Sequence, residues 1–219
     1  MRVRKALIVG INDISVVIAR LLVSNGYDVS MIASNESEAR LGRGGVPAYV
    51  YVGDPKDESI LRGGGGIDES EVVVLSMDDE TNLEVARIAK SRGGVPTIIA
   101  LISNKEKYLD AFIELGVYAI PIVDAVLSKI AHYLKLPFKQ LLYSDDKVQA
   151  YYVVISSESP YINQEVRDVA RRCGVAIPLI IRGGEGIIIS DEELRIEAGD
   201  KLFIVGASDS VVKCVEKIY

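Results

Sequence analysis

The sequence is poor in the side chains on which many enzymes and metal sites depend. It has one histidine, His132, and two cysteines, Cys173 and Cys214. A single histidine leaves no set from which a Ser/His/Asp triad can be assembled, and we interpret it as a helix-surface residue. The cysteines are far apart and lack metal-ligand spacing. We interpret them as small buried hydrophobic residues in a reducing compartment.

Long apolar runs and an excess of positive charge are also missing. No stretch approaches the ~20 residues that a membrane-spanning helix needs. Arg2, Arg4 and Lys5 lead into a short strand-like stretch rather than a signal segment. The net charge of −6 argues against nucleic acid as a partner. We therefore expect a cytoplasmic protein, and any role at a membrane must pass through a partner.

What the sequence has is a regular alternation of short apolar runs and helical patterns. Strands are expected at 6–9, 29–32, 48–52, 72–75, 97–102 and 118–120, and helices at 14–24, 81–91, 105–115 and 123–134. Continuous apolar runs such as Ala6–Val9 are typical of strands buried on both faces. This alternation predicts an α/β fold with a parallel, doubly wound, Rossmann-like sheet in a domain of residues 1–140.

The pattern changes in the last third of the chain. Leu136-Pro137 ends the last helix, and 144–147 reads as a polar linker. Strands are then expected at 151–155, 176–181, 186–189 and 201–205, with helices at 164–173 and 208–218. We predict a smaller α+β domain over residues 141–219. Small domains gain stability by pairing, and the helix 123–134 is apolar on several sides, so we expect at least a homodimer.

The loop after the first strand is where a dinucleotide-binding fold carries its glycine motif. Gly10 stands at the first glycine position, but Asn12 replaces the second, and its side chain occupies the approach of a phosphate. Ser15 is small enough for close helix packing. Free amides at this helix start can hold an anion, although Asp13 adds a negative charge. A pyrophosphate site and a plain strand-to-helix turn are both open interpretations.

The second strand of such a fold usually ends in an acid that binds the ribose hydroxyls. Here Ala33 occupies that place, and its methyl side chain cannot hydrogen-bond to a ribose diol. Ser34 and Asn35 can hydrogen-bond, and Glu36 is a further candidate. A solvated turn that caps the next helix is the favoured interpretation.

Two further loops follow strands at the same expected edge of the sheet. Gly53 permits a sharp exit after the third strand, and Asp54 with Pro55 suits the start of a helix. Ser76 and Asp78 follow the fourth strand, where three consecutive acids favour a helix start. Ligands of parallel sheets bind at this edge, and the acids also allow a cation.

The order of these motifs resembles the TrkA-type regulators of potassium transport, also called RCK or KTN domains. The markers in the first domain are 52–54 with 60–61, then 74–76 with Asp78, Asp79 and Asn82. Those in the second are 159–162, 180–184, 197–202 and 205–206. The resemblance implies a peripheral cytoplasmic subunit that forms dimers and rings. It implies gating of a membrane potassium channel or transporter in response to NAD(H) or ATP/ADP.

Three departures from that family bear on the ligand. The glycine motif is reduced to Gly10, the ribose acid is replaced by Ala33, and Leu101 stands where the family commonly has an arginine. We therefore expect a weakened nucleotide site with cofactor-binding candidates Gly10, Asn12, Asp13, Ser15, Ser34, Gly53, Asp54, Ser76 and Asp78, and no catalytic or metal residues. An NAD(P)-dependent oxidoreductase and a ligand-free structural assembly module remain alternatives.

The resemblance also implies a second ligand site, because the family's C-terminal half binds small ligands such as cyclic di-AMP. The polar residues that could contribute are Ser156, Asn163, Arg167, Arg171 and Arg182. Solvated helix charges are the favoured interpretation of these residues.

Overall fold

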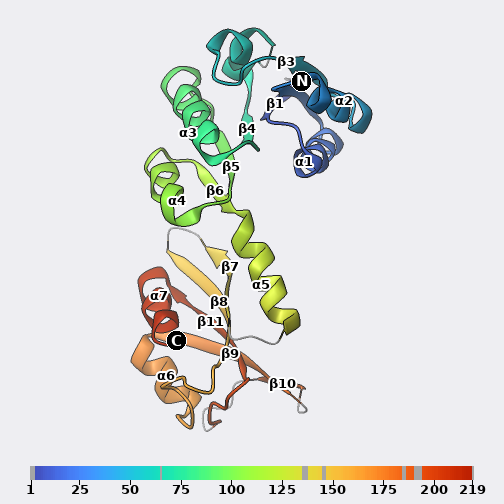
Figure 1. Cartoon of the computed structure of the whole chain (residues 1–219). Coiled ribbons are helices and arrows are strands. Elements are labelled where there is room, and N and C mark those ends of the chain that lie inside the picture. Colours follow the sequence, from blue (N-terminus) through green and yellow to red (C-terminus); the bar gives the residue numbers. More distant parts are fainter. Residues whose placement is uncertain are drawn as a thin grey trace. The chain divides into compact units, whose positions relative to one another are not determined.

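The structure is a computed structural model that describes residues 3–64, 66–134, 138–144, 147–183, 186–189 and 194–218. The chain divides into two compact units, Met1–Val123 and Asp124–Tyr219 (Figure 1). In the described part of the chain, no helix is both long and apolar enough to cross a bilayer.

The first unit is built on a six-stranded sheet with the order β3-β2-β1-β4-β5-β6. Its strands all run parallel. They are β1 (Arg4–Val9), β2 (Tyr27–Ala33), β3 (Tyr49–Val52), β4 (Val72–Leu75), β5 (Thr97–Ile102) and β6 (Tyr118–Pro121). The predicted Rossmann-like α/β sheet is confirmed.

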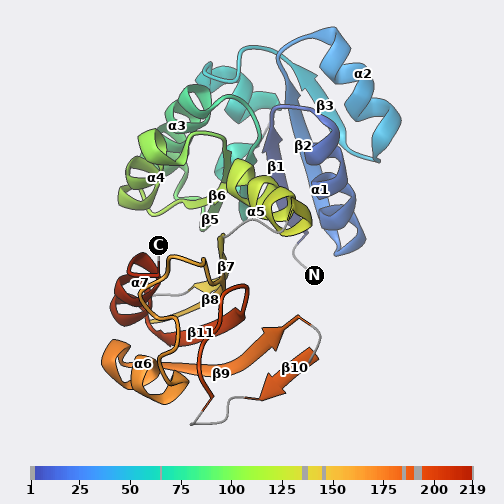
Figure 2. The ribbon, with the colours of Figure 1, turned by 60° about the horizontal axis from the view of Figure 1, so that its bottom comes forward.

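Helices cover both faces of this sheet (Figure 2). They are α1 (Asp13–Ser24), α2 (Glu36–Gly45), α3 (Asp79–Ile88) and α4 (Lys105–Glu114), with short helical turns η1 (Ile60–Gly64), η2 (Ile67–Glu69) and η3 (Ala89–Gly93). Buried residues of α1 and α2 share one core cluster with Ala6 and Ile8, and those of α3 and α4 share another with Leu7 and Val9. Successive residues of β1 thus enter opposite cores, which explains its continuous apolar run.

The second unit contains an antiparallel sheet of five strands in the order β10-β9-β11-β8-β7. Its elements are β7 (Lys139–Ser144), β8 (Val148–Val154), α6 (Val166–Cys173), β9 (Val175–Arg182), β10 (Gly186–Ile189), β11 (Lys201–Ala207) and α7 (Ser208–Glu216). Helix α5 (Ile122–Leu134) spans the division between the units. Helices α6 and α7 lie on the same side of the sheet, over one apolar core.

Strand β7 was not expected from the sequence. It pairs with β8, so the predicted boundary between residues 140 and 141 falls inside a strand of the second sheet. Ser144, the first residue of the predicted linker, ends β7, and Val148, the residue after the linker, begins β8. Asp145, Asp146, Leu136-Pro137 and the His132 side chain lie outside the described residues.

A buried ion pair joins β9 to the start of β11. The Asp200 carboxylate, whose side chain is 0% exposed, accepts hydrogen bonds from Arg182 Nε at 2.8 Å and Nη2 at 2.7 Å. Arg182 Nη1 also donates to Glu197 Oε1 at 2.8 Å. Removing one partner of such a pair would leave a buried charge unmatched. The sequence suggests Arg182 as a phosphate ligand. In the structure its guanidinium instead pairs with carboxylates of the same unit.

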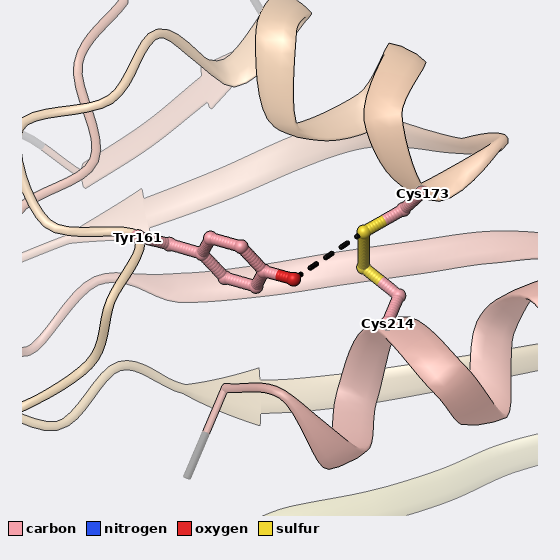
Figure 3. Close-up of a disulfide and its surroundings, with 3 residues drawn as sticks. All are labelled: Tyr161, Cys173 and Cys214. Atoms are coloured by element: carbon pink, nitrogen blue, oxygen red, sulfur yellow. Dashed lines mark hydrogen bonds between the residues drawn. A yellow bond between two sulfur atoms is a disulfide. The ribbon is translucent and has the colours of Figure 1, made fainter.

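The two cysteines form a disulfide, so their interpretation as separate small hydrophobic residues is wrong. Cys173 ends α6 and Cys214 lies on α7, with their Cα atoms 5.4 Å apart (Figure 3). The Tyr161 hydroxyl lies 3.6 Å from Cys173 Sγ. The pairing arises because both helices pack on one face of the second sheet, a relation that sequence spacing does not reveal.

Reducing this disulfide is expected to destabilise the second unit. The bond closes a loop across a sequence separation of 41 residues, and the chain entropy of such a loop corresponds to about 3–4 kcal/mol. Denaturant unfolding of the full chain with and without reductant measures the difference. A variant carrying both Cys173→Ser and Cys214→Ser must unfold at one midpoint under both conditions. Equal midpoints for oxidised and reduced wild type would contradict the prediction.

Candidate functional site

The candidate site lies at the carboxyl edge of the first sheet, where five loops leave its parallel strands. Helix α1 packs on one face of the sheet and α3 on the other. The chain therefore changes face between the neighbouring strands β1 and β4. In open α/β sheets a ligand crevice lies at this kind of switch point.

Gly10 ends β1 beside the loop that follows β4. Its φ is +91°, and a Cβ atom built there would lie 2.8 Å from Ser76 O and 2.9 Å from Ser76 C. Glycine is thus required by the turn, as predicted, and also by the close approach of a second loop. This second reason was not visible in the sequence.

Asn12 caps α1 and bridges to the same neighbouring loop. Its Oδ1 accepts the Ser15 N–H at 3.0 Å, while Ser15 Oγ accepts the Asn12 N–H at 2.8 Å. Its Nδ2 donates to Ser76 O and to Ser76 Oγ, both at 2.9 Å. Ser15 is buried beneath the helix start, whereas Asp13 is exposed. The strand-to-helix turn is present, and the Asn12 side chain reaches across to the loop after β4.

The end of β2 differs from the expectation in its orientation. The side chain of Ala33 is 0% exposed and packs in the core with α1 and α2. Ala33 therefore presents no polar group at the end of β2. The residue that follows, Ser34, turns its N–H toward Glu38 Oε2 at 2.9 Å.

Glu38 is the residue that sequence reasoning missed at this strand end. Asn35 Oδ1 accepts the Glu38 N–H, and Asn35 Nδ2 donates to Glu38 Oε1, both at 3.0 Å. The favoured interpretation, a turn that caps α2, is confirmed. Glu36 instead pairs with Arg43 at 3.2 Å. An acid three residues after an Asn cap is the sequence signal that could have identified Glu38.

Gly53 and Asp54 form a turn rather than the start of a helix. The Gly53 N–H donates to Ala33 O at 3.0 Å, and a Cβ at Gly53 would lie 2.8 Å from Ile60 Cδ1. Asp54 Oδ1 accepts the Lys56 N–H at 2.9 Å. Helical turns begin only after Asp57, so the predicted cap at Asp54 with Pro55 as first helical residue is wrong.

Two of the three acids after β4 accept hydrogen bonds from backbone N–H groups. Asp78 Oδ1 accepts the Thr81 N–H at 3.0 Å and caps α3. Asp79 is buried, and its two carboxylate oxygens accept the N–H groups of Ser103 at 2.8 Å and Asn104 at 2.7 Å. Among the described residues, no group of three His, Cys, Asp or Glu side chains is placed to hold a metal ion.

Asn82 joins the loop after β4 to the end of β5. Its Oδ1 accepts the Met77 N–H, and its Nδ2 donates to the carbonyls of Met77 and Leu101, all at 3.0 Å. The side chain is 1% exposed, so these bonds satisfy a buried amide. Leu101 itself is 7% exposed and belongs to the core.

Some of the predicted site residues therefore meet and others do not. Gly10, Asn12 and Ser76 form one contact, with Ser15 beneath it, and the Gly53 backbone lies beside the end of β2. Asp54 and Asp78 each hold their own turn or cap. The edge carries several carboxylates, which oppose the binding of a polyanion.

Comparison with known proteins identifies the family. Residues 6–126, more than half of the chain, match the TrkA-N domain. The chain belongs to that family. Residues 150–215 match the TrkA-C domain. The TrkA-N and TrkA-C domains therefore account for the two units, and the resemblance drawn from the sequence is confirmed.

Its relatives extend over nearly the whole chain. The Trk system potassium uptake protein TrkA of Mycobacterium tuberculosis is 24% identical over 212 residues, which cover 94% of each chain. The TrkA homolog of Methanothermobacter thermautotrophicus is 25% identical over 222 residues, 96% of this chain and 97% of the relative. The solved GsuK channel bound to NAD has a TM-score of 0.58 at 16% identity, covering all of this chain and 40% of its own. That likeness shows the fold alone.

The cap at Asp78 gives a pH-dependent prediction. Hydrogen bonds from the Thr81 backbone and then its side chain hold the pKa of Asp78 below its ordinary value of 3.8. The cap therefore stabilises the fold above the unfolded-state pKa and loses this effect as pH falls through the lower folded-state pKa. We expect Asp78→Ala to cost about 1 kcal/mol at neutral pH.

Unfolding midpoints of wild type and Asp78→Ala between neutral pH and pH about 2.5 measure this difference. The difference must shrink at the acidic end. Asp78→Asn is the matched control, because an asparagine cap does not titrate and its advantage over alanine must not vary with pH. A wild-type advantage that stays constant to the acidic end would refute the role of the ionised cap.

Proposed function

We propose that this chain is a regulatory subunit that senses a nucleotide and controls a membrane potassium channel or transporter. The observation that carries the proposal is the match to relatives named Trk system potassium uptake proteins along nearly their whole length. In this proposal the chain is cytoplasmic and peripheral to the inner face of the membrane, which it reaches through its partner.

The proposed ligand is an adenine nucleotide, NAD(H) or ATP/ADP, bound at the carboxyl edge of the first sheet. A channel structure with the same fold is described as bound to NAD, and another as bound to ADP. In this chain, Ser34 and Glu38 supply polar groups at the end of β2, where a ribose would lie. The acidic edge and the Asn12 side chain at the start of α1 favour weak binding with little discrimination between these nucleotides.

The polar residues at the start of α3 hold the loops of this edge and do not favour catalysis. Asp78, Asp79 and Asn82 are each hydrogen-bonded to backbone groups that hold the loops. A general acid or base must reach a substrate proton, and these groups face the protein's own amides and carbonyls. Turnover of NAD(P) with simple alcohols or hydroxy acids would favour the alternative, an oxidoreductase.

Isothermal titration of the full chain with ATP, ADP and NADH tests the sensing role. We expect saturable but weak binding, and we expect Glu38→Gln to weaken every ribose-bearing ligand by about tenfold, since a charged hydrogen bond contributes about 1.5–3 kcal/mol. Glu36→Gln is the matched control and should bind as wild type does. The absence of heat and of any nucleotide-induced thermal stabilisation would instead support a ligand-free assembly module.

Self-association is the second part of the proposal. Along α5, an apolar stripe is exposed at Val126, Leu127, Ile130 and Leu134, with exposed fractions of 47–63%. These positions recur at helical spacing, so they share one side of the helix. A second copy of the chain that covers this stripe would remove it from water.

Light scattering of the full chain at micromolar concentration is therefore expected to report at least a dimer. A double substitution, Leu127→Glu with Ile130→Glu, should shift the mass toward the monomer by placing charges in the buried interface. Lys129→Glu changes the charge of an exposed neighbour outside the stripe and should keep the wild-type mass. A monomeric wild type would remove the support for a ring of subunits.

A further inference from the structure

The Asn12 side chain bridges the two loops that follow β1 and β4. Strands β1 and β4 end side by side, because the Ser76 N–H, just after β4, donates to the carbonyl oxygen of Val9, the last residue of β1, at 2.8 Å. The helices that follow leave toward opposite faces of the sheet. A ligand whose phosphates rest on the amides of α1 must enter between these two loops.

Asn12 holds this gap with three hydrogen bonds. One bond, from the Ser15 N–H, caps the helix, and the other two reach Ser76 on the opposite side. We call the pair Asn12–Ser76 the crevice bridge. Because one amide makes all three contacts, its rotamer is fixed from both sides, and releasing it exposes two acceptors on Ser76 and one donor on Ser15 together.

We propose that Asn12 is a specificity-determining residue that occupies the contacts of a second phosphate, so that NAD(H), ATP and ADP bind no more tightly than a nucleoside monophosphate. The proposal rests on the proposed nucleotide-sensing function and names the ligand class within it. Nucleosides and nucleoside monophosphates, held mainly at the ribose end, are accepted. Nucleoside diphosphates and dinucleotides gain nothing from their second phosphate.

The physical reason is competition for the same groups. A diphosphate on the start of α1 would have to accept the Ser15 N–H that Asn12 Oδ1 now accepts. It would also have to displace the Asn12 amide from Ser76, and Asp13 places a carboxylate at the first helical position. The strand end that carries Ser34 and Glu38 makes none of the bridge's hydrogen bonds, so a nucleoside is not subject to this competition.

Two substitutions separate the bridge from the cap. Serine is an effective helix cap but too short to reach Ser76, so Asn12→Ser keeps the cap and removes the bridge. Asn12→Gly removes both and gives the crevice the glycine of a dinucleotide motif. The matched control is Asn104→Ser, because Asn104 caps α4 by accepting the Lys107 N–H at 3.0 Å at the same edge of the sheet.

The experiment is calorimetric titration of the full-length wild type and these variants with adenosine, AMP, ADP and NAD. In the wild type we expect ADP and NAD to bind no more tightly than AMP. Asn12→Gly should bind ADP and NAD at least about tenfold more tightly, the factor that one gained charge-assisted hydrogen bond supplies. Asn12→Ser, which keeps the Ser15 N–H capped, should show a smaller gain for the same two ligands. Adenosine affinity should change less than about twofold, within the range of a lost surface contact. Asn104→Ser should match wild type with all four ligands.

Unchanged affinity of both Asn12 variants for ADP and NAD overturns the bridge proposal. An equal gain for all four ligands also overturns it, because that result indicates general loosening of the loop. If adenosine and AMP bind but the Asn12 variants show no higher affinity for ADP and NAD, the bridge proposal is rejected and the nucleotide-sensing function is retained. If no ligand binds any of the proteins, the nucleotide-sensing function fails with it. Thermal unfolding of each variant confirms that the comparison is made between folded proteins.

Discussion

The arrangement at the carboxyl edge of the first sheet depends on how closely two loops approach each other at Gly10. The loop after β4 passes so near that a Cβ atom at this position would meet the Ser76 backbone. Only glycine allows this contact together with a φ of +91°. The contact brings Ser76 within reach of Asn12. The same loop carries the Asp78 cap, and Asn82 of α3 joins this loop to the end of β5.

Much of the first unit could be predicted because local and long-range forces agree there. Strands buried on both faces appear as unbroken apolar runs, and helix starts appear as Asn or Asp caps, as at Asn12, Asn35 and Asp78. Strand β7 gives no such signal. It lies at the edge of its sheet, and Leu141, Leu142 and Tyr143 are exposed, so no burial pattern marks it.

The candidate site shows where sequence reasoning reaches its limit. Its residues were located at the correct strand ends, but the direction of each side chain was not fixed. At the end of β2 a shift of one position exchanges the core for the edge of the sheet, which separates Ala33 from Ser34. The partners of Asn12 and Asn82 lie 64 and 19 residues away, so only the fold brings them together. The same holds for Arg182 with Asp200.

The disulfide of the second unit changes the topology of the covalent chain itself. Cys173 and Cys214 close a ring that contains the whole of β9, β10 and β11, three of the five strands of this sheet. In the oxidised polypeptide, β9 and β11 both belong to that ring, so they pair within it. The loop that must close for these two strands to pair is therefore short, and its entropic cost is small, even when the rest of the chain is unfolded. Strands β7 and β8 stay outside the ring, so their attachment requires a contact between the ring and the open part of the chain.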